Sequence, residues 1–167
     1  MRGRHDAARL SFKQRVGRPL LARLPITRFL FDQLRVEANA LLAALERTCS
    51  PRVKRRIREL RGARDLLVNV GCGPQVLDGF VNIDLFAASP GVLRYDCRRG
   101  LPLADGSAAG IKLEHFVEHL EPREELPAVL AACHRVLAPG GVLRIAVPDA
   151  ERFIRAYVSG GPAPYAS

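Results

Sequence analysis

The sequence predicts an α/β fold: a Rossmann-like, mostly parallel open sheet that follows a basic, mainly helical N-terminal extension. Short apolar runs of about five residues recur between residues 66 and 147, and most end at Gly, Asp or Glu. Such runs are typical of parallel strands that are buried on both faces. One longer segment between them has helical periodicity, as the crossovers of a parallel sheet require. The 167 residues leave room for one domain of ordinary size.

Each expected element has its own local signal. The strands are apolar and rich in Val, Leu and Ile; they are expected at residues 66–70, 80–84, 92–96, 110–114 and 142–147. The helices show apolar residues at spacings of three and four; they are expected at residues 27–47, 52–61, 122–137 and 150–157. Ser50-Pro51 predicts the N-cap and first residue of the second helix. Pro127 allows the regular part of the third helix to begin there, and Pro139-Gly140-Gly141 predicts a turn.

The charge of the chain is uneven, and this suggests three regions. Residues 1–65 carry 17 Lys or Arg and 6 Asp or Glu, a net charge of +11, whereas residues 66–167 carry 9 and 11, a net charge of −2. We expect a basic extension at 1–62, a core at 63–158 and a loose tail at 159–167. The extension suits an acidic membrane surface or another polyanion, although no specific nucleic-acid motif is present. The alternative is a helical cap on the core.

The cysteines and the apolar runs indicate the compartment. Cys49, Cys72, Cys97 and Cys133 form no CxxC pair, which favours free thiols in a reducing environment. No N-terminal apolar run resembles a secretory signal, and the run at 38–45 is far shorter than the ~20 residues of a membrane span. We therefore expect a cytoplasmic location.

Glycines and acids gather where the expected strands end. In a parallel sheet these positions meet at one edge, where ligands bind; they are Gly71, Gly73, Asp84, Asp96, Glu114, His115 and Asp149. Glycine lets the main chain turn tightly and approach a ligand, and a carboxylate such as Asp84 can accept hydrogen bonds from a ribose diol. A dinucleotide fits less well, because Val76 stands at the third glycine position and only residues 71–79 separate the two strands. At each acid the alternative is an ordinary turn or cap.

A histidine pair follows the fourth expected strand. His115, Glu118 and His119 match the H-x-x-E-H pattern, which on a helix could hold zinc for a hydrolase. Pro122 interrupts such a helix. The site would also need a third ligand, for which the options are Glu121, Glu124, Glu125, Asp149 and Glu151. The other interpretations are that His119 packs a short helix or that His115 acts in the site.

Taken in order, these segments resemble the class I S-adenosylmethionine-dependent methyltransferases, and among them a small prokaryotic group with a short glycine loop. The resemblance covers about residues 66–157 and rests on these motifs: NVGCG at 69–73, GFVNID at 79–84, Asp96, LPLADGS at 101–107, EHFVEHL at 114–120, RVLAPGG at 135–141 and LRIAVPD at 143–149. It implies S-adenosylmethionine as cofactor. Gly71 and Gly73, with Cys72, would lie near its methionine part; Asp84, with Leu85, near the ribose; Asp96, with Cys97, near the adenine; and Glu114 near the sulfonium.

The resemblance also implies a reaction. The chain would transfer a methyl group to a small-molecule or envelope-related acceptor, with His115 as a base and Glu118 or His119 as orienting partners. Two features depart from the family pattern. Ala108 and Ala109 replace an aromatic and an acidic residue, and only about five of the usual seven strands are recognisable, so the chain looks C-terminally incomplete. A non-catalytic nucleoside-binding module and an H-x-x-E-H zinc hydrolase remain the alternatives, and an oligomer is open.

Overall fold

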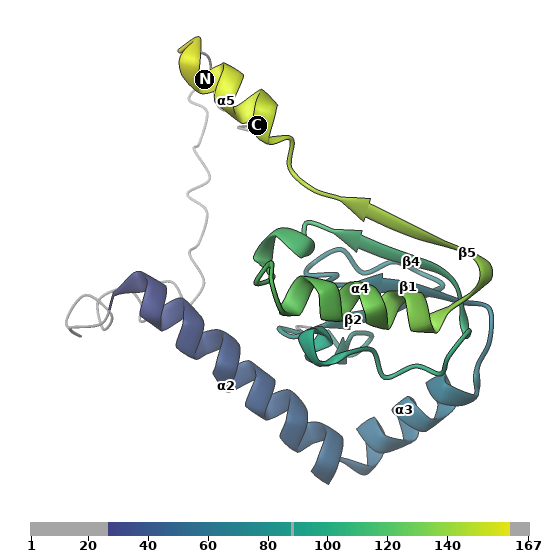
Figure 1. Cartoon of the computed structure of the whole chain (residues 1–167). Coiled ribbons are helices and arrows are strands. Elements are labelled where there is room, and N and C mark those ends of the chain that lie inside the picture. Colours follow the sequence, from purple (N-terminus) through teal and green to yellow (C-terminus); the bar gives the residue numbers. More distant parts are fainter. Residues whose placement is uncertain (1–26, 88, 161–167) are drawn as a thin grey trace, which may run out of the picture. The chain divides into compact units, whose positions relative to one another are not determined.

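The computed structural model describes residues 27–87 and 89–160 (Figure 1). The chain divides into two compact units, residues 1–38 and 39–167. The described part of the first unit holds the beginning of helix α2 (Arg28–Cys49), and the second unit holds all other elements. The expectations for residues 1–26 and for residues 161–167 of the tail lie outside the described residues. Among the described helices, none has the length and apolar character needed to cross a membrane.

The second unit is built on a sheet of five parallel strands. They are β1 (Leu66–Val70), β2 (Phe80–Asp84), β3 (Leu93–Arg94), β4 (Ala108–Glu114) and β5 (Leu137–Ala146). Their order across the sheet is β3-β2-β1-β4-β5, and every neighbouring pair is parallel. The predicted Rossmann-like α/β class is confirmed.

Three strands differ from their predicted bounds. β4 begins two residues earlier than expected, at Ala108, which pairs with Leu66 and Leu137; the other two differ for local reasons. The strand expected at 92–96 ends at Arg94, because Asp96 instead caps a 3₁₀ turn, η1 (Cys97–Arg99), by accepting a hydrogen bond from the amide of Arg98. The turn expected at Pro139–Gly141 lies inside β5 as an irregularity: Leu137 pairs with Ala108, and pairing resumes with Val142 opposite Gly110. Extra residues on one strand of a pair are accommodated as a bulge.

Helices pack on one face of the sheet and form the core. Helix α3 (Pro51–Gly62) begins at the predicted N-cap Ser50, whose hydroxyl accepts a hydrogen bond from the amide of Val53. Helix α4 (Glu125–Val136) begins two residues before Pro127, which therefore lies in its first turn. Both helices contribute to a core with the inward residues of the strands: Ile57, Leu60, Val68, Val70, Ile83, Ile111, Leu113, Val129, Cys133 and Val136. The last helix, α5 (Ala150–Val158), buries no residue.

The other face of the sheet is much more open. Strand register places Leu67, Gly110 and Val142 in one row on this face. The Leu67 side chain is 41% exposed and that of Val142 is 65% exposed. The connections β1–β2 and β2–β3, which could carry covering helices, contain none among their described residues. In the β1–β2 connection, residues 71–79 are too few to form a covering helix.

Helix α2 buries alanines, whereas its leucine-rich face, which the sequence pattern suggests should pack, is exposed. Ala40 and Ala43 are buried, whereas Leu41, Leu42 and Leu45 are largely exposed. Small side chains let a helix approach its neighbour closely, and here Ala40 and Ala43 line a small depression with Tyr95. The Arg47 guanidinium lies over the Tyr95 ring, 5.8 Å from its centroid, an arrangement that adds a cation–π contact. The second half of α2 is thus attached through alanines rather than leucines.

Candidate functional site

The candidate site lies where the direction of the sheet connections reverses. Strand β1 is flanked by β2 on one side and β4 on the other, so the chain leaves the carboxyl ends of β1 and β4 at adjacent places. Such a switch point is where open α/β sheets bind ligands. The residues that follow the two strands, Gly71 and the His115-Phe116 pair, are brought together there. A Cβ placed on Gly71 would lie 2.2 Å from Cδ2 of Phe116, which shows how closely the ring covers the glycine.

The glycine turn is fixed by its backbone conformation and by strand β2. Gly71 and Gly73 have φ values of +65° and +50°, a region that favours glycine. The amides of Gly71 and Cys72 both donate to the carbonyl of Ile83, at 2.9 and 3.2 Å. A Cβ on Gly73 would meet no atom within 4 Å. Bare main chain therefore faces open space at Gly73, while Gly71 is covered.

Asp84 joins this turn to the end of β2. One carboxylate oxygen accepts a hydrogen bond from the amide of Gly73 at 2.8 Å, and the other accepts from the amide of Phe86 at 2.6 Å. Each oxygen has two lone pairs, so each keeps one acceptor position after these bonds. The side chain is half-buried, as is Leu85 after it. The structure thus places Asp84 directly beside Gly73, at hydrogen-bonding distance.

Two buried asparagines hold the nine-residue connection between β1 and β2. The Asn69 amide nitrogen donates to the side-chain oxygen of Asn82 at 3.0 Å and to the carbonyl of Gln75 at 2.9 Å. Asn82 in turn bonds both the amide and the carbonyl of Leu77. Sequence reasoning assigned these residues no such function. The available signal was two polar residues at the same place in two apolar strands, in register across the pair.

Asp96 is engaged inside the protein. Its carboxylate forms a bidentate pair with the Arg98 guanidinium, with both contacts at 2.9 Å, and Arg99 lies 3.5 Å away. The side chain is buried, and so is that of Cys97. Burial is the main cause that raises the pKa of the Cys97 thiol well above its ordinary value. Asp96 thus acts as a turn cap and an ion-pair partner, which are ordinary roles for an acid at a strand end. The contact of Asp96 with adenine stays a prediction.

Glu114 ends β4 as a paired carboxylate. The Lys112 ammonium lies 2.5 Å and the Arg144 guanidinium 3.4 Å from the same oxygen. The hydrogen bond from Lys112 is the main cause that lowers the pKa of Glu114 below its ordinary value. All three residues share the open face of the sheet, because Lys112 and Glu114 alternate with the buried Ile111 and Leu113 in β4, and Arg144 of β5 pairs in register with Lys112. Glu114 is therefore ionised at neutral pH.

His115 has an unusual backbone conformation. It directly precedes Phe116, whose ring covers Gly71. Its φ is +52°, in the left-handed region that non-glycine residues rarely adopt, and its amide donates to the carbonyl of Ala146 at 3.0 Å. The ring nitrogen Nδ1 lies 3.3 Å from a carboxylate oxygen of Glu118. The His115 side chain is 57% exposed, so a ligand can reach it from solvent.

The structure does not form the helix that a zinc site would need. The histidines flank a 3₁₀ helix, η2 (Val117–His119), and the left-handed conformation of His115 lies outside it. The i, i+4 face of an α-helix is therefore absent, and the described residues contain no group of three or more metal-ligating side chains. The His119 side chain is exposed.

Asp149 is a helix cap: its carboxylate accepts a hydrogen bond from the amide of Arg152 at 3.1 Å.

Cys72, in the glycine turn, is unsuited to act as a nucleophile. Its side chain is buried, and burial, with a smaller effect of the nearby Asp84 charge, raises the pKa of the thiol to about 11. The thiolate is the reactive form of cysteine, and at neutral pH this residue is a neutral thiol. The buried Cys72 side chain contributes packing within the glycine turn.

Comparison with known proteins agrees with this geometry. Residues 82–145 match the model of a family described as a methyltransferase domain. The matched segment runs from β2 to β5 and includes Asp84, Asp96 and the segment at 114–119, whereas the glycine turn precedes it. No curated protein matches the chain. Members of the matched family use S-adenosylmethionine as the methyl donor. The matched segment is thus similar to a methyltransferase domain, and the parallel five-stranded sheet fits that similarity.

Proposed function

We propose that the protein binds S-adenosylmethionine at the switch point between β1 and β4 and methylates a small-molecule or envelope-related acceptor. The observation that carries this proposal is the arrangement of Asp84: a half-buried carboxylate tied to the amide of Gly73, beside main chain that faces open space. A ribose diol requires acceptors at such a place, and the remaining lone pairs of Asp84 supply them.

The residues present fit this cofactor better than a dinucleotide. No helix follows β1 directly, so the turn lacks the helix N-terminus that would hold a pyrophosphate. The open space over Gly73 accepts a ligand without steric conflict. Gly71, Cys72 and Gly73 would hold the methionine part, Asp84 and Leu85 the ribose, and the segment around Asp96 and Cys97 the adenine. Glu114 would lie near the reacting centre.

When bound, S-adenosylmethionine supplies a methyl group on a positively charged sulfur that is already reactive. The protein then has to orient the acceptor and take its proton, and orientation alone can contribute several kcal/mol. His115 suits the second task. If Nδ1 carries the proton and donates it to Glu118, Nε2 is left as a free acceptor for the proton of a hydroxyl or amine. The strained backbone at His115 is consistent with a functional position, since such conformations gather at active sites. His119, exposed at the end of the same segment, is the second orienting candidate.

The test is methyl transfer by the full chain from a labelled donor to a panel of hydroxyl and amine acceptors. We expect His115→Gln to lower the single-turnover rate by about 10²–10⁴-fold, the usual contribution of a general base, without loss of donor binding. The matched control is His134→Gln, because His134 is an exposed histidine on α4 outside the site. An unchanged rate in His115→Gln would remove the base role. Donor binding without transfer to any acceptor would instead assign the non-catalytic binding module.

A further inference from the structure

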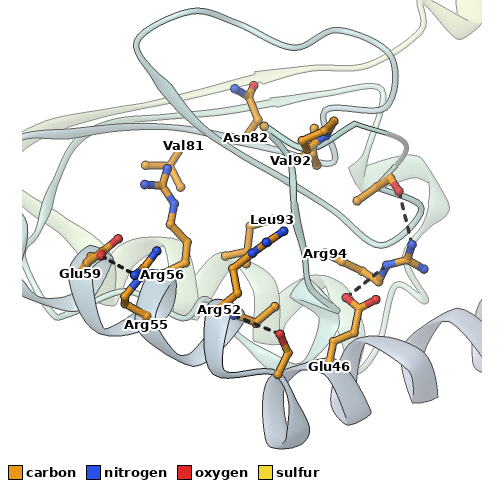
Figure 2. A pocket seen from close by; sticks show the side chains of 15 residues that line it. Glu46, Arg52, Arg55, Arg56, Glu59, Val81, Asn82, Val92, Leu93 and Arg94 are labelled. Carbon is orange, nitrogen blue, oxygen red and sulfur yellow. Dashed lines mark hydrogen bonds and ion pairs between the residues drawn. The ribbon is translucent and has the colours of Figure 1, made fainter.

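A second concave site lies along the edge of the sheet, apart from the site described above. A cavity of about 650 Å³ is bounded by α3, by Val81 and Asn82 of β2, and by the described residues of the β2–β3 connection (Figure 2). Its volume lies within the range of small-molecule sites. Gly71, Gly73, Asp84 and His115 do not line it, so a ligand here would leave the proposed cofactor site free.

The cavity is lined by apolar and charged side chains, and its four arginines outnumber its two carboxylates, Glu46 and Glu59. Val53 of α3 and Val92 before β3 contribute apolar surface, and Arg52, Arg55, Arg56 and Arg94 surround it. Figure 2 shows the Arg52 and Arg56 side chains extending from α3 toward the strand side of the cavity. The lining therefore suits a molecule with an anionic group and an apolar body.

Two of these arginines have no carboxylate partner within the described part of the chain. Arg55 pairs with Glu59 at 3.6 Å and Arg94 pairs with Glu46 at 3.5 Å. Arg52 and Arg56 form no such pair among the described residues, and both are exposed. Their i, i+4 spacing puts them on one side of α3, so two flexible guanidiniums can converge on one anion.

Phosphate is the anion that this arrangement suits best. Guanidinium forks donate two parallel hydrogen bonds to phosphate oxygens. Ser50, the N-cap of α3, also lines the cavity, so the positive end of the helix dipole faces the same space. Residues 1–26 carry seven Lys or Arg and one Asp, so their charge does not complement these arginines.

We infer that this cavity binds a phosphate ester carried on an apolar group, with Arg52 and Arg56 on the phosphate and Val53 and Val92 against the apolar part. The same chemistry is offered by a free organophosphate and by the headgroup of an anionic phospholipid. The inference is independent of methyl transfer and stands whether or not the cofactor site is active.

The experiment uses the full chain and two probes. Phenyl phosphate is titrated by calorimetry, with inorganic phosphate and phenol as partial probes. Phosphatidylcholine vesicles with and without phosphatidylglycerol are tested by sedimentation. The variant is Arg52→Gln/Arg56→Gln. The matched control is Arg58→Gln/Arg61→Gln, which removes the same charge from the same helix at positions that do not line the cavity.

We expect phenyl phosphate to bind more tightly than either partial probe, and the cavity variant to weaken it by about tenfold or more, as the loss of charged hydrogen bonds predicts. The control variant should change affinity less than about twofold, since long-range charge is screened by salt. Binding of anionic vesicles alone, lost in the cavity variant, would assign the lipid headgroup. Equal losses in the two variants, or no binding of either probe, would overturn the inference. Affinity for S-adenosylmethionine should be the same in wild type and the cavity variant.

Discussion

At the scale of single residues, Gly71 and Gly73 show that two glycines in one turn are needed for different reasons. Both have positive φ, so both favour glycine through backbone conformation. Only Gly71 is also covered, by the Phe116 ring. Gly71 therefore couples the end of β1 to the segment after β4, whereas Gly73 leaves space for a ligand.

We expect Gly71→Ala to destabilise the protein more than Gly73→Ala. Both substitutions incur about 1–2 kcal/mol from the left-handed conformation, and Gly71→Ala adds a steric clash of about 1–3 kcal/mol. Denaturant unfolding of the full chain measures the difference. Phe116→Ala combined with Gly71→Ala should recover the clash component. Equal destabilisation by the two alanines would show that the ring does not cover Gly71.

Glu114 gives a second prediction at this scale, through pH. Because Lys112 lowers the pKa of Glu114 in the folded state, the pair stabilises the fold above the unfolded-state pKa of the carboxyl. That contribution is lost as pH falls through the lower folded-state pKa. In Lys112→Met we expect the Glu114 pKa to rise, and the decrease of stability in acid to become smaller.

Carbon-13 NMR titration of the Glu114 carboxyl measures the change directly. Arg144→Gln serves as the comparison and should raise the pKa less, because Arg144 is more distant from the carboxylate. A Glu114 pKa that is the same in wild type and Lys112→Met would contradict the pairing.

At the scale of elements, helix α2 shows why an apolar stripe alone does not orient a helix. The periodicity correctly predicts a helix at 27–47, observed at Arg28–Cys49. Its leucines at 41, 42 and 45 are exposed, whereas its alanines are buried. Which side packs depends on the shape of the neighbouring surface at Tyr95, and that surface is formed only by the folded sheet.

The orientation of α2 can be tested by two substitutions of opposite kind. Ala43→Leu should destabilise the fold by about 1–3 kcal/mol, because it adds volume at a buried position. Leu41→Gln should change stability by less than about 0.5 kcal/mol, because the Leu41 side chain is 62% exposed. Thermal or urea unfolding of both variants is the measurement. The reverse order of effects would show that the leucine side packs against the body.

Short-range sequence signals predicted the strands of the sheet, but they predicted less accurately the residues at which those strands begin and end. Val68, Val70, Ile111 and Leu113 are buried, as parallel strands require, and the Ser50 cap lies where predicted. The strand at 92–96 was predicted too long, because Asp96 forms its pair with the later Arg98. The bulge in β5 was predicted as a turn, since Pro-Gly-Gly indicates a break but not that pairing resumes after it.

At the scale of the whole molecule, the sheet order explains why residues that are scattered along the sequence lie at one edge of the sheet. Gly71, Asp84 and Glu114 are up to 43 positions apart in the sequence, but they lie at the carboxyl ends of three strands that are neighbours in the sheet. Alternation of apolar runs and acids was sufficient to predict this edge. The asparagine network at Asn69 and Asn82 and the ring of Phe116 over Gly71 could not be predicted, because they depend on strand register and on side-chain packing.

The binding of a ribose by Asp84 is the central claim, and one calorimetric comparison tests it most directly. The full chain is titrated with S-adenosylhomocysteine and with its 2′-deoxy analogue, in wild type and in Asp84→Asn. Asn82→Ala is the control for loosening of the turn, because it removes bonds to Leu77 without changing the carboxylate.

We predict that wild type binds the parent compound about tenfold or more tightly than the analogue, since a hydrogen bond to a charged group contributes about 1.5–3 kcal/mol. In Asp84→Asn this preference should disappear, and in Asn82→Ala it should persist even if both affinities fall. Equal affinity of wild type for the two compounds, or no measurable affinity for either, would contradict the account.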